Sequence, residues 1–252
     1  MKIVTWNVNS LKVRLPHVLE YLEHEKPDVL ALQETKQQDK DFPQAELEAA
    51  GYHVQFAGQK TYNGVAIISQ KEATDMVFDV PNLDDPQRRL LAATIDGVRI
   101  IDVYIPNGQE VGCDKYQYKF RWLNALRDFL KTELENHKKL VLLGDYNIAP
   151  TDLDIHDPSR WVEKIMCSTP EREWFFSLMD MGLNDTLRQL HPDEPMHSWW
   201  DYRMNAFRRQ WGIRIDHILA TEALQIQAGG VHADYRKKER PSDHAPVWAE
   251  FS

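Results

Sequence analysis

Cysteine is scarce in this sequence. Only Cys113 and Cys167 occur among 252 residues, with no Cys-x-x-Cys pair and no obvious histidine partner nearby. A disulfide framework or a structural zinc site needs more cysteines, or cysteines at closer spacing. We therefore expect two unlinked and inert thiols.

Long hydrophobic runs are also missing. No apolar segment approaches the roughly 18 residues of a membrane-spanning helix, and the start, Met1-Lys2-Ile3-Val4-Thr5-Trp6-Asn7, has a strand-like pattern unlike that of a secretion signal. Hydrophobic content of 42% and charged content of 27% are typical of a globular protein. We expect a single domain over residues 1–252, no membrane role and a cytoplasmic location.

An excess of positive charge is the third absence. The formal net charge of −9 argues against a protein that coats nucleic acid through bulk electrostatics. Basic residues still gather in four places: Arg88-Arg89, Lys115 with Lys119 and Arg121, Arg203 through Arg214, and Arg236 through Arg240. Each cluster alone is typical of a solvated face, whereas together they fit a small phosphate-binding strip around an acidic site.

Hydrophobic periodicity predicts a mixed α and β protein. Strand patterns cover Lys2–Val8, Asp28–Gln33, His53–Phe56, Gly64–Ser69, Leu90–Ile95, Val98–Tyr104, Leu140–Leu143, Arg214–Ala220 and Pro246–Phe251. Several of these runs are apolar on both faces, as expected of strands covered by helices or by another sheet. Helical spacing runs from Val13 to Leu22 and from near Asp114 to Leu134, and Ser168-Thr169-Pro170-Glu171 predicts a helix start with a stop at Gly182.

Carboxylates and amides stand where the predicted strands end. Glu34 ends one run and Asn7 ends the first strand, so both project from the same sheet edge if these strands are neighbours. Asp145 follows an apolar run and Gly144, and its spacing of two to Asn147 is the strand period that puts side chains on one face. Such oxygens are the ligands that Mg²⁺ or Mn²⁺ prefers. Alone, Glu34 would be read as a surface acid and Gly-Asp-Tyr-Asn as a turn.

A histidine provides the complementary charge. Asp216 lies on an otherwise apolar strand, where a buried acid needs a partner. We pair it with His244, in the rigid loop Ser242-Asp243-His244-Ala245-Pro246. A carboxylate bonded to one ring nitrogen fixes the tautomer and favours the protonated form, which leaves the other nitrogen to face a phosphate.

Seven short strings together resemble one family. They are Trp6-Asn7-Val8-Asn9, Leu32-Gln33-Glu34, Tyr62-Asn63-Gly64-Val65-Ala66, Gly144-Asp145-Tyr146-Asn147, Ser198-Trp199-Trp200-Asp201-Tyr202-Arg203, Arg214-Ile215-Asp216 and Ser242-Asp243-His244-Ala245-Pro246. Their order and spacing resemble the exonuclease III family of AP endonucleases over essentially the whole chain. The resemblance implies an α/β fold: a four-layered α/β sandwich with two packed, mostly antiparallel β-sheets flanked by helices.

The resemblance also implies roles for individual residues. Glu34 would hold the principal metal with Asn7 beside it and Asp243 at or near a second metal position. Asp145 would orient or deprotonate the attacking water, with Asn147 helping to hold it. His244, backed by Asp216, would contact the scissile phosphate. The wider metal set is Asn7, Glu34, Asp145, Asn147, Asp243 and His244, and the metal would be Mg²⁺ or Mn²⁺.

Further residues would contact DNA. Tyr104 and Asn107 match positions near the phosphate. Trp199, Ile213 and Ile215 fall where the family accepts a flipped-out abasic sugar, and Arg203 ends the same tryptophan-rich string. Ile213 is smaller than an aromatic residue found there in some members, which leaves the selectivity of the pocket open.

The activity implied is metal-dependent cleavage of duplex DNA on the 5′ side of abasic sites, with removal of blocking groups or nucleotides from 3′ ends. The main alternative is an enzyme that acts mainly as a 3′-exonuclease or 3′-phosphatase, and a lip at residues 155–167 is the segment expected to decide between them. Two rivals are another phosphatase or sphingomyelinase of the same superfamily and a non-catalytic regulator on this fold. The partner would be double-stranded DNA with abasic sites or damaged 3′ ends, and the chain is expected to be a monomer.

Overall fold

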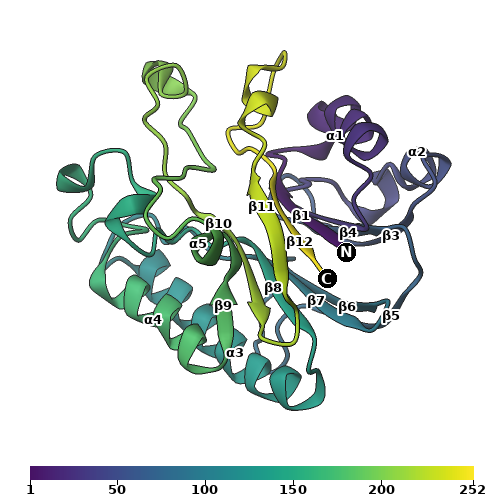
Figure 1. Ribbon diagram of the computed structural model, residues 1–252, viewed down its shortest axis with the longest axis horizontal. Helices are drawn as coiled ribbons and strands as arrows, with labels where there is room; N and C mark the ends of the chain where they lie inside the picture. The colour runs from purple at the N-terminus through teal and green to yellow at the C-terminus, as the bar shows by residue number, and fades with distance from the viewer.

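The computed structural model describes residues 1–252 and contains two six-stranded sheets (Figure 1). The first sheet has the order β11 (Ile226–Val231), β12 (Val247–Phe251), β1 (Lys2–Asn7), β2 (Val29–Gln33), β4 (Val65–Ser69) and β3 (His53–Ala57). The second has the order β5 (Ala73–Phe78), β6 (Leu90–Ile95), β7 (Val98–Tyr104), β8 (Leu140–Asp145), β10 (Asp216–Thr221) and β9 (Leu183–Asp185).

Each sheet has a single parallel pair at its centre. These pairs are β1 with β2 in the first sheet and β7 with β8 in the second, and all other neighbours are antiparallel. A parallel pair needs a crossover between its strands, usually a helix. The helices α1 (Leu11–Glu25) and α3 (Asp114–Asn136) fall within the two crossovers.

Helices cover the outer face of each sheet. The helices α1 and α2 (Gln44–Ala49) pack on the first sheet, and α3 and α4 (Thr169–Asp180) pack on the second. A short helix, α5 (Thr186–Leu190), contacts β10 and β11. Short 3-10 helices occur at Asp39–Asp41, Asp152–Asp154, Pro158–Arg160, Arg203–Asn205 and Ala233–Lys237.

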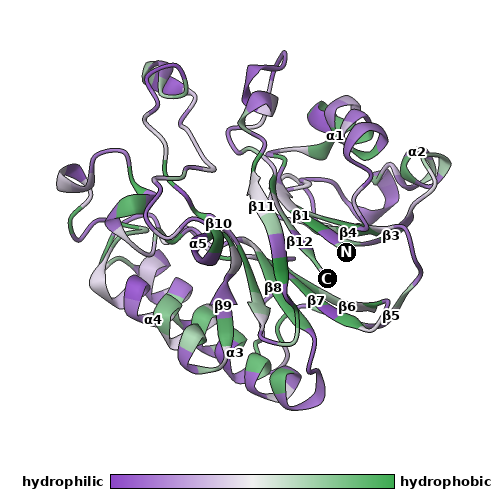
Figure 2. Ribbon diagram, in the orientation of Figure 1, coloured by the Kyte–Doolittle hydropathy of each residue, from purple (hydrophilic) through white to green (hydrophobic).

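The buried apolar residues form three main layers. One cluster lies between the sheets and joins residues such as Ile3 and Ile67 to Leu91 and Leu143. The other two lie between each sheet and its helices. Figure 2 shows the same division, with green strands at the centre and purple residues on the outer sides of the helices. This arrangement confirms the four-layered sandwich with mostly antiparallel sheets.

Two helix predictions are confirmed at their ends. The helix α4 begins directly after Ser168, whose backbone N–H donates to Glu171 at 3.2 Å in a capping box. It ends before Gly182, which has a φ of +95°. The helix α3 covers the apolar pattern predicted from Asp114 onward. None of the helices combines the length and the apolar composition that a membrane-spanning segment requires.

The strands that periodicity missed all lie at sheet edges. They are β5, β9 and β11. Residues 74–76 of β5 are exposed, β9 has only three residues, and β11 contains Gly229 and Gly230. Edge strands pack on fewer neighbours, so their hydrophobic pattern is weak.

The strands β7 and β8 approach each other closely at Gly144. This residue has a φ of +139°, and a Cβ atom added there would lie 1.9 Å from the Val103 carbonyl oxygen. The same pair of strands places Tyr104 opposite Asp145. Glycine at position 144 therefore allows the register that brings these two side chains to the sheet edge.

We predict that Gly144→Ala lowers the free energy of unfolding by about 3 kcal/mol or more, because backbone strain and overpacking add. Gly182→Ala is the matched control: its φ is also positive, at +95°, but no atom lies within 4 Å of the added Cβ. It should cost only about 1 kcal/mol. Urea unfolding of both variants measures the difference, and equal losses would contradict the close approach at Val103.

Candidate active site

Asn7 and Glu34 meet at one edge of the first sheet. The strands β1 and β2 are parallel neighbours with Asn7 opposite Gln33, and Glu34 follows directly with a φ of +52°. The Asn7 Nδ2 group donates to Glu34 Oε1 at 2.9 Å. This confirms the prediction that Asn7 and Glu34 lie together at one sheet edge.

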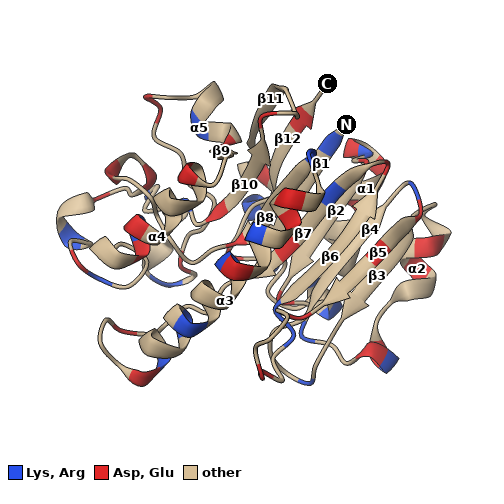
Figure 3. Cartoon of the chain, turned by 90° about the horizontal axis from the view of Figure 1, so that it is seen from below, with Lys and Arg blue, Asp and Glu red and all other residues tan.

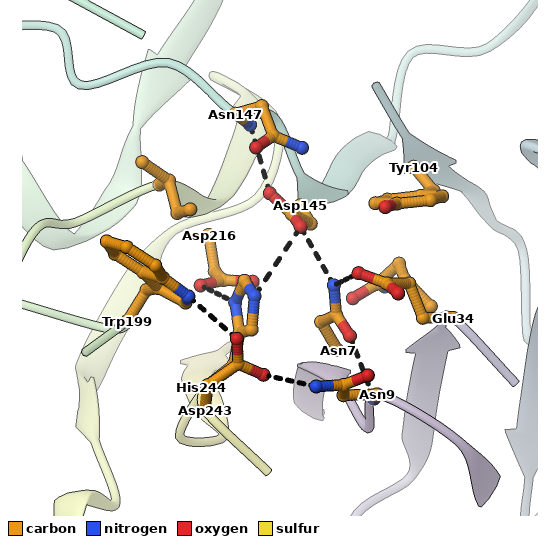
Figure 4. Close-up of polar contacts among 12 residues, drawn as sticks. Asn7, Asn9, Glu34, Tyr104, Asp145, Asn147, Trp199, Asp216, Asp243 and His244 are labelled. Carbon is orange, nitrogen blue, oxygen red and sulfur yellow. Dashed lines mark hydrogen bonds and ion pairs between the residues drawn. The ribbon is translucent and has the colours of Figure 1, made fainter. Parts of the chain in front are cut away.

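Asp145 reaches the same point from the second sheet. It is the last residue of β8, and its Oδ2 accepts a second hydrogen bond from Asn7 Nδ2, at 2.8 Å. One amide group therefore links carboxylates from both sheets (Figure 4). The candidate site lies where the two sheets converge at one edge.

Asn147 is close to Asp145 for a different reason from the one predicted. The strand ends at Asp145, and Asn147 has a left-handed φ of +50°, so the two-residue strand period does not apply. Instead the Asn147 backbone N–H turns back and donates to Asp145 Oδ1 at 3.0 Å. The Asn147 side chain accepts from Asn107 Nδ2 at 2.9 Å, which brings that predicted phosphate contact into the same group.

His244 pairs with Asp216, as predicted. Its Nδ1 lies 2.8 Å from Asp216 Oδ2, and its Nε2 lies 3.7 Å from Asp145 Oδ2. Burial alone would lower the pKa of His244, but the charges of Asp216 and Asp145 outweigh burial and raise the pKa to about 10. These charges favour the protonated ring, whose Nε2 faces Asp145.

The acids at this edge form a possible metal site. Ligand atoms of Glu34, Asp145 and His244 all lie within 4.8 Å of one another. Burial, with the nearby charge of Asp216, raises the pKa of Asp145 to about 7 although His244 opposes the shift. Burial also disfavours the charged form of Glu34, but Lys36 and Asn7 outweigh it and lower that pKa. Two carboxylates that lie close together offer the oxygen ligands that a hard divalent cation prefers.

Asp243 lies beside this group. Its Oδ2 accepts from Trp199 Nε1 at 2.9 Å and its Oδ1 accepts from Asn9 Nδ2 at 3.0 Å. Both carboxylate oxygens thus have donors, and Figure 4 shows Asp243 next to His244 and linked to Trp199 and Asn9. A second metal position at Asp243 stays a prediction.

Tyr104 lies near Glu34 and Asp145 in the candidate site (Figure 4). It ends β7, and Figure 4 shows its ring directed toward Glu34 and Asp145. The Arg89 guanidinium lies 4.6 Å from the ring centre. Burial, together with the charge of Glu34, raises the pKa of Tyr104 well above its usual range, so the phenol keeps its proton.

An apolar cavity of about 460 Å³ adjoins the site. Trp199 and Ile213 line it, together with His156, Trp161, Asp201, Arg203, Met204, Ala206 and Trp211. Trp199 pairs with both Ile213 and His244 through isolated β-bridges, which place the cavity next to the histidine. His156 and Trp161 come from residues 155–167, so the predicted lip forms part of the cavity wall.

The structure corrects the expected placement of Ile215 and Lys119, and it gives the location of Arg203. Ile215 is 2% exposed and packs behind Ile213 with Met166 and Cys167, so it supports the cavity but does not line it. Arg203 is at the rim, with its side chain 85% exposed and paired with Asp201. Lys119, counted above in a phosphate-binding strip, is fully buried and cannot face DNA. In the view of Figure 3, Lys and Arg residues are interspersed with Asp and Glu residues.

Sequence reasoning missed several supporting residues. Ser198 Oγ donates to Asp216 Oδ2 at 2.6 Å, and Asn9 holds Asp243. Lys36 Nζ lies 2.8 Å from Glu34 Oε2. Ser198 and Asn9 stand in the strings that carried the family resemblance, so their position beside the acids was the available signal. Nothing in the local pattern singled out Lys36, and Arg89 was identified only as part of a basic cluster, without its contact with Tyr104.

Comparisons with known proteins give matches over nearly the whole chain. Residues 4–244 match the profile of the endonuclease/exonuclease/phosphatase family. Exodeoxyribonuclease III of Haemophilus influenzae is 37% identical over 267 aligned residues, covering all of both chains. The structure of the 3′ phosphatase NExo from Neisseria, bound to a product DNA hairpin, has a TM-score of 0.99 at 52% identity and covers 100% of this chain and 99% of its own. An AP endonuclease from Archaeoglobus fulgidus has a TM-score of 0.96 at 37% identity, with 100% and 99% coverage.

We predict that Asp216→Asn lowers the pKa of His244, because the largest of the charge effects that stabilise the imidazolium is removed. In the parent chain the folded pKa is about 10 against an ordinary 6.5, so this group stabilises the fold fully below pH 6.5. That contribution is lost as the pH rises through about 10, and in the variant it should be lost at lower pH.

Histidine titration by NMR, with urea unfolding from pH 6.5 to 10 in EDTA, measures both effects. Asp152→Asn is the control, because the Asp152 side chain is 71% exposed and pairs with Arg172. An unchanged His244 titration in Asp216→Asn would show that Asp216 does not set the charge of the ring.

Proposed function

This chain belongs to the endonuclease/exonuclease/phosphatase family and is a nuclease of the exodeoxyribonuclease III type, and we propose that it repairs duplex DNA. It would cut on the 5′ side of abasic sites and remove nucleotides or phosphate groups from 3′ ends. The relatives support both activities: one is titled a 3′ phosphatase and another an AP endonuclease.

The observation that carries this proposal is the complete group of polar residues at the sheet edge. Glu34, Asn7 and Asp145 are joined by hydrogen bonds, and His244 is held by Asp216. A non-catalytic regulator would not need a buried histidine with a raised pKa beside two acids. The cavity beside Trp199 sets the site apart from a phosphatase for small soluble substrates, because it offers an apolar place for a sugar next to the phosphate position.

Asp145, Asn147 and His244 would have different roles in the hydrolysis of a phosphate ester. Asp145, which is held by Asn7 and by the Asn147 N–H and lies beside His244, would orient the attacking water and accept its proton. The Asn147 backbone N–H fixes one oxygen of Asp145, which leaves Oδ2 toward Asn7 and His244. His244 Nε2, held protonated by Asp216, would donate to a phosphate oxygen as negative charge develops there.

Glu34 and Asp145 would hold Mg²⁺ or Mn²⁺, which neutralises negative charge on the phosphate and on the leaving oxygen. Asn7 would keep the two carboxylates at a fixed separation. His244 would contact the phosphate through Nε2, because its Nδ1 is held by Asp216. Asn147 and Asp243 are proposed as nearby oxygen donors, and Tyr104 as a neutral hydroxyl donor to the phosphate.

The DNA would extend over the rim of the site. Asn107 is exposed and bonded to Asn147, so it can contact a phosphate next to the scissile one. Trp199 and Ile213 would receive a flipped-out sugar, while Arg203 at the rim would contact the backbone. We also propose that residues 1–252 act as a single domain and a monomer, in the cytoplasm, where DNA is found in bacteria such as those of the relatives.

Cleavage of two end-labelled duplexes tests this proposal. One duplex has an internal abasic-site analogue, and the other has a 3′-phosphate at a nick. The parent chain should process both with Mg²⁺ and neither with EDTA. Glu34→Gln should lose about 10²-fold or more in turnover on both, because it removes a carboxylate ligand.

Processing of the 3′ end alone would replace the proposal by its alternative, a 3′-exonuclease or 3′-phosphatase. Equal activity with Mg²⁺ and with EDTA would contradict the proposed metal site.

A further inference from the structure

Lys119 is a buried cation that the proposed chemistry does not use. It lies on α3, and its side chain has no exposed surface. Burial lowers its pKa, and the charge of Glu171 opposes that shift. A buried ammonium group is costly unless each of its N–H groups finds an acceptor.

The acceptors of Lys119 come from three separate segments. Its Nζ donates to the Asn147 carbonyl oxygen at 2.8 Å, to the Asn107 carbonyl oxygen at 3.3 Å, and to Glu171 Oε1. Asn147 and Asn107 are the residues whose side chains join in the active site. Lys119 thus holds the backbone beneath both of them.

Glu171 extends the same group of contacts to the lip at residues 155–167. Its Oε1 accepts from the Met166 N–H at 3.1 Å, and its Oε2 accepts from Ser168 Oγ at 2.7 Å. The Met166 carbonyl in turn accepts from the Ala149 N–H at 2.8 Å, two residues after Asn147. The end of the lip and the catalytic loop are therefore tied to one buried ion pair.

The space around this pair is closely filled. A Cβ atom at Gly108 would lie 2.9 Å from Ile165 Cδ1 and 3.1 Å from Lys119 Cδ. The loop carrying Asn107 consequently lies between the lip and the lysine. A small shift of Lys119 would move the loop, since close-packed interiors transmit displacement.

We propose that Lys119 is a positioning residue, which sets the placement of Asn107 and Asn147 relative to the lip. This inference rests on the proposed function, because it takes Asn147 as part of the catalytic group. An ion pair kept only for stability could be replaced by uncharged residues of similar size with little loss. An ion pair that positions two catalytic loops cannot be replaced in this way without a loss in turnover.

The test uses the full chain with Lys119→Met and the double variant Lys119→Met/Glu171→Gln. The double variant leaves no buried unpaired charge, and glutamine can still close the capping box at Ser168. The matched control is Arg99→Met/Glu133→Gln. Arg99 on β7 and Glu133 on α3 also form a buried ion pair, with Arg99 Nε 2.5 Å from Glu133 Oε2. The other acceptors of Arg99 are Asp75 and Thr94, which lie outside residues 105–110 and 147–150.

In the double variant at Lys119, kcat on the 3′-phosphate duplex should fall about tenfold or more, because small misplacements of reacting groups are costly. KM should stay within about threefold if the DNA surface is intact. Hydrogen exchange should rise in residues 105–110 and 147–150. The control pair should keep its kcat and its exchange in those residues.

A kcat in the double variant equal to that of the control, with unchanged exchange, would overturn the proposal and make the ion pair purely stabilising. If Lys119→Met alone fails to fold, the comparison of the double variant with the control pair still tests the proposal. If the parent chain cuts neither duplex, the proposed function fails, and hydrogen exchange alone then decides whether Lys119 orders the two loops.

Discussion

The contact between Asn7 and two carboxylates joins the two halves of the site. The Asn7 amide has two N–H bonds, and they go to Glu34 from the first sheet and Asp145 from the second. A neutral donor is suited to this place because it holds two like charges close together without adding a third. Every other polar group of the site, from Asp216 to Tyr104, is arranged around the point that this amide marks (Figure 4).

The two sheets supply the site in the same manner. Asn7 ends β1 and Glu34 follows β2, which form the parallel pair of the first sheet, whereas Tyr104 ends β7 and Asp145 ends β8, the parallel pair of the second. Open sheets bind ligands outside the carboxyl ends of their parallel strands. The packing of two such edges side by side produces one site with acids from both, and the loops before β10 and β12 add Trp199 and His244 from the same side (Figure 1).

Much of this arrangement could be predicted from the sequence, but some of it could not. An acid on an apolar strand needs a partner, and this reasoning correctly joined Asp216 to His244. The strand period failed at Asn147 because the chain turns there with a positive φ, a departure that residue spacing does not reveal. Charge clustering failed at Lys119, since a basic residue on a helix can face a buried acid that lies 52 positions away in the sequence. Edge strands were missed because little packing constrains their sequence.

The binding of Mn²⁺, followed by the loss of the free-ion signal in electron paramagnetic resonance, tests whether the two sheets share one metal site. We expect one Mn²⁺ site in the parent chain, which Asn7→Ala weakens by about 10-fold or more, as expected when the support of a metal ligand is removed, and which Glu34→Gln weakens further. Unchanged Mn²⁺ affinity in both variants would contradict it, because the acids of the two sheets would then not form a common metal site.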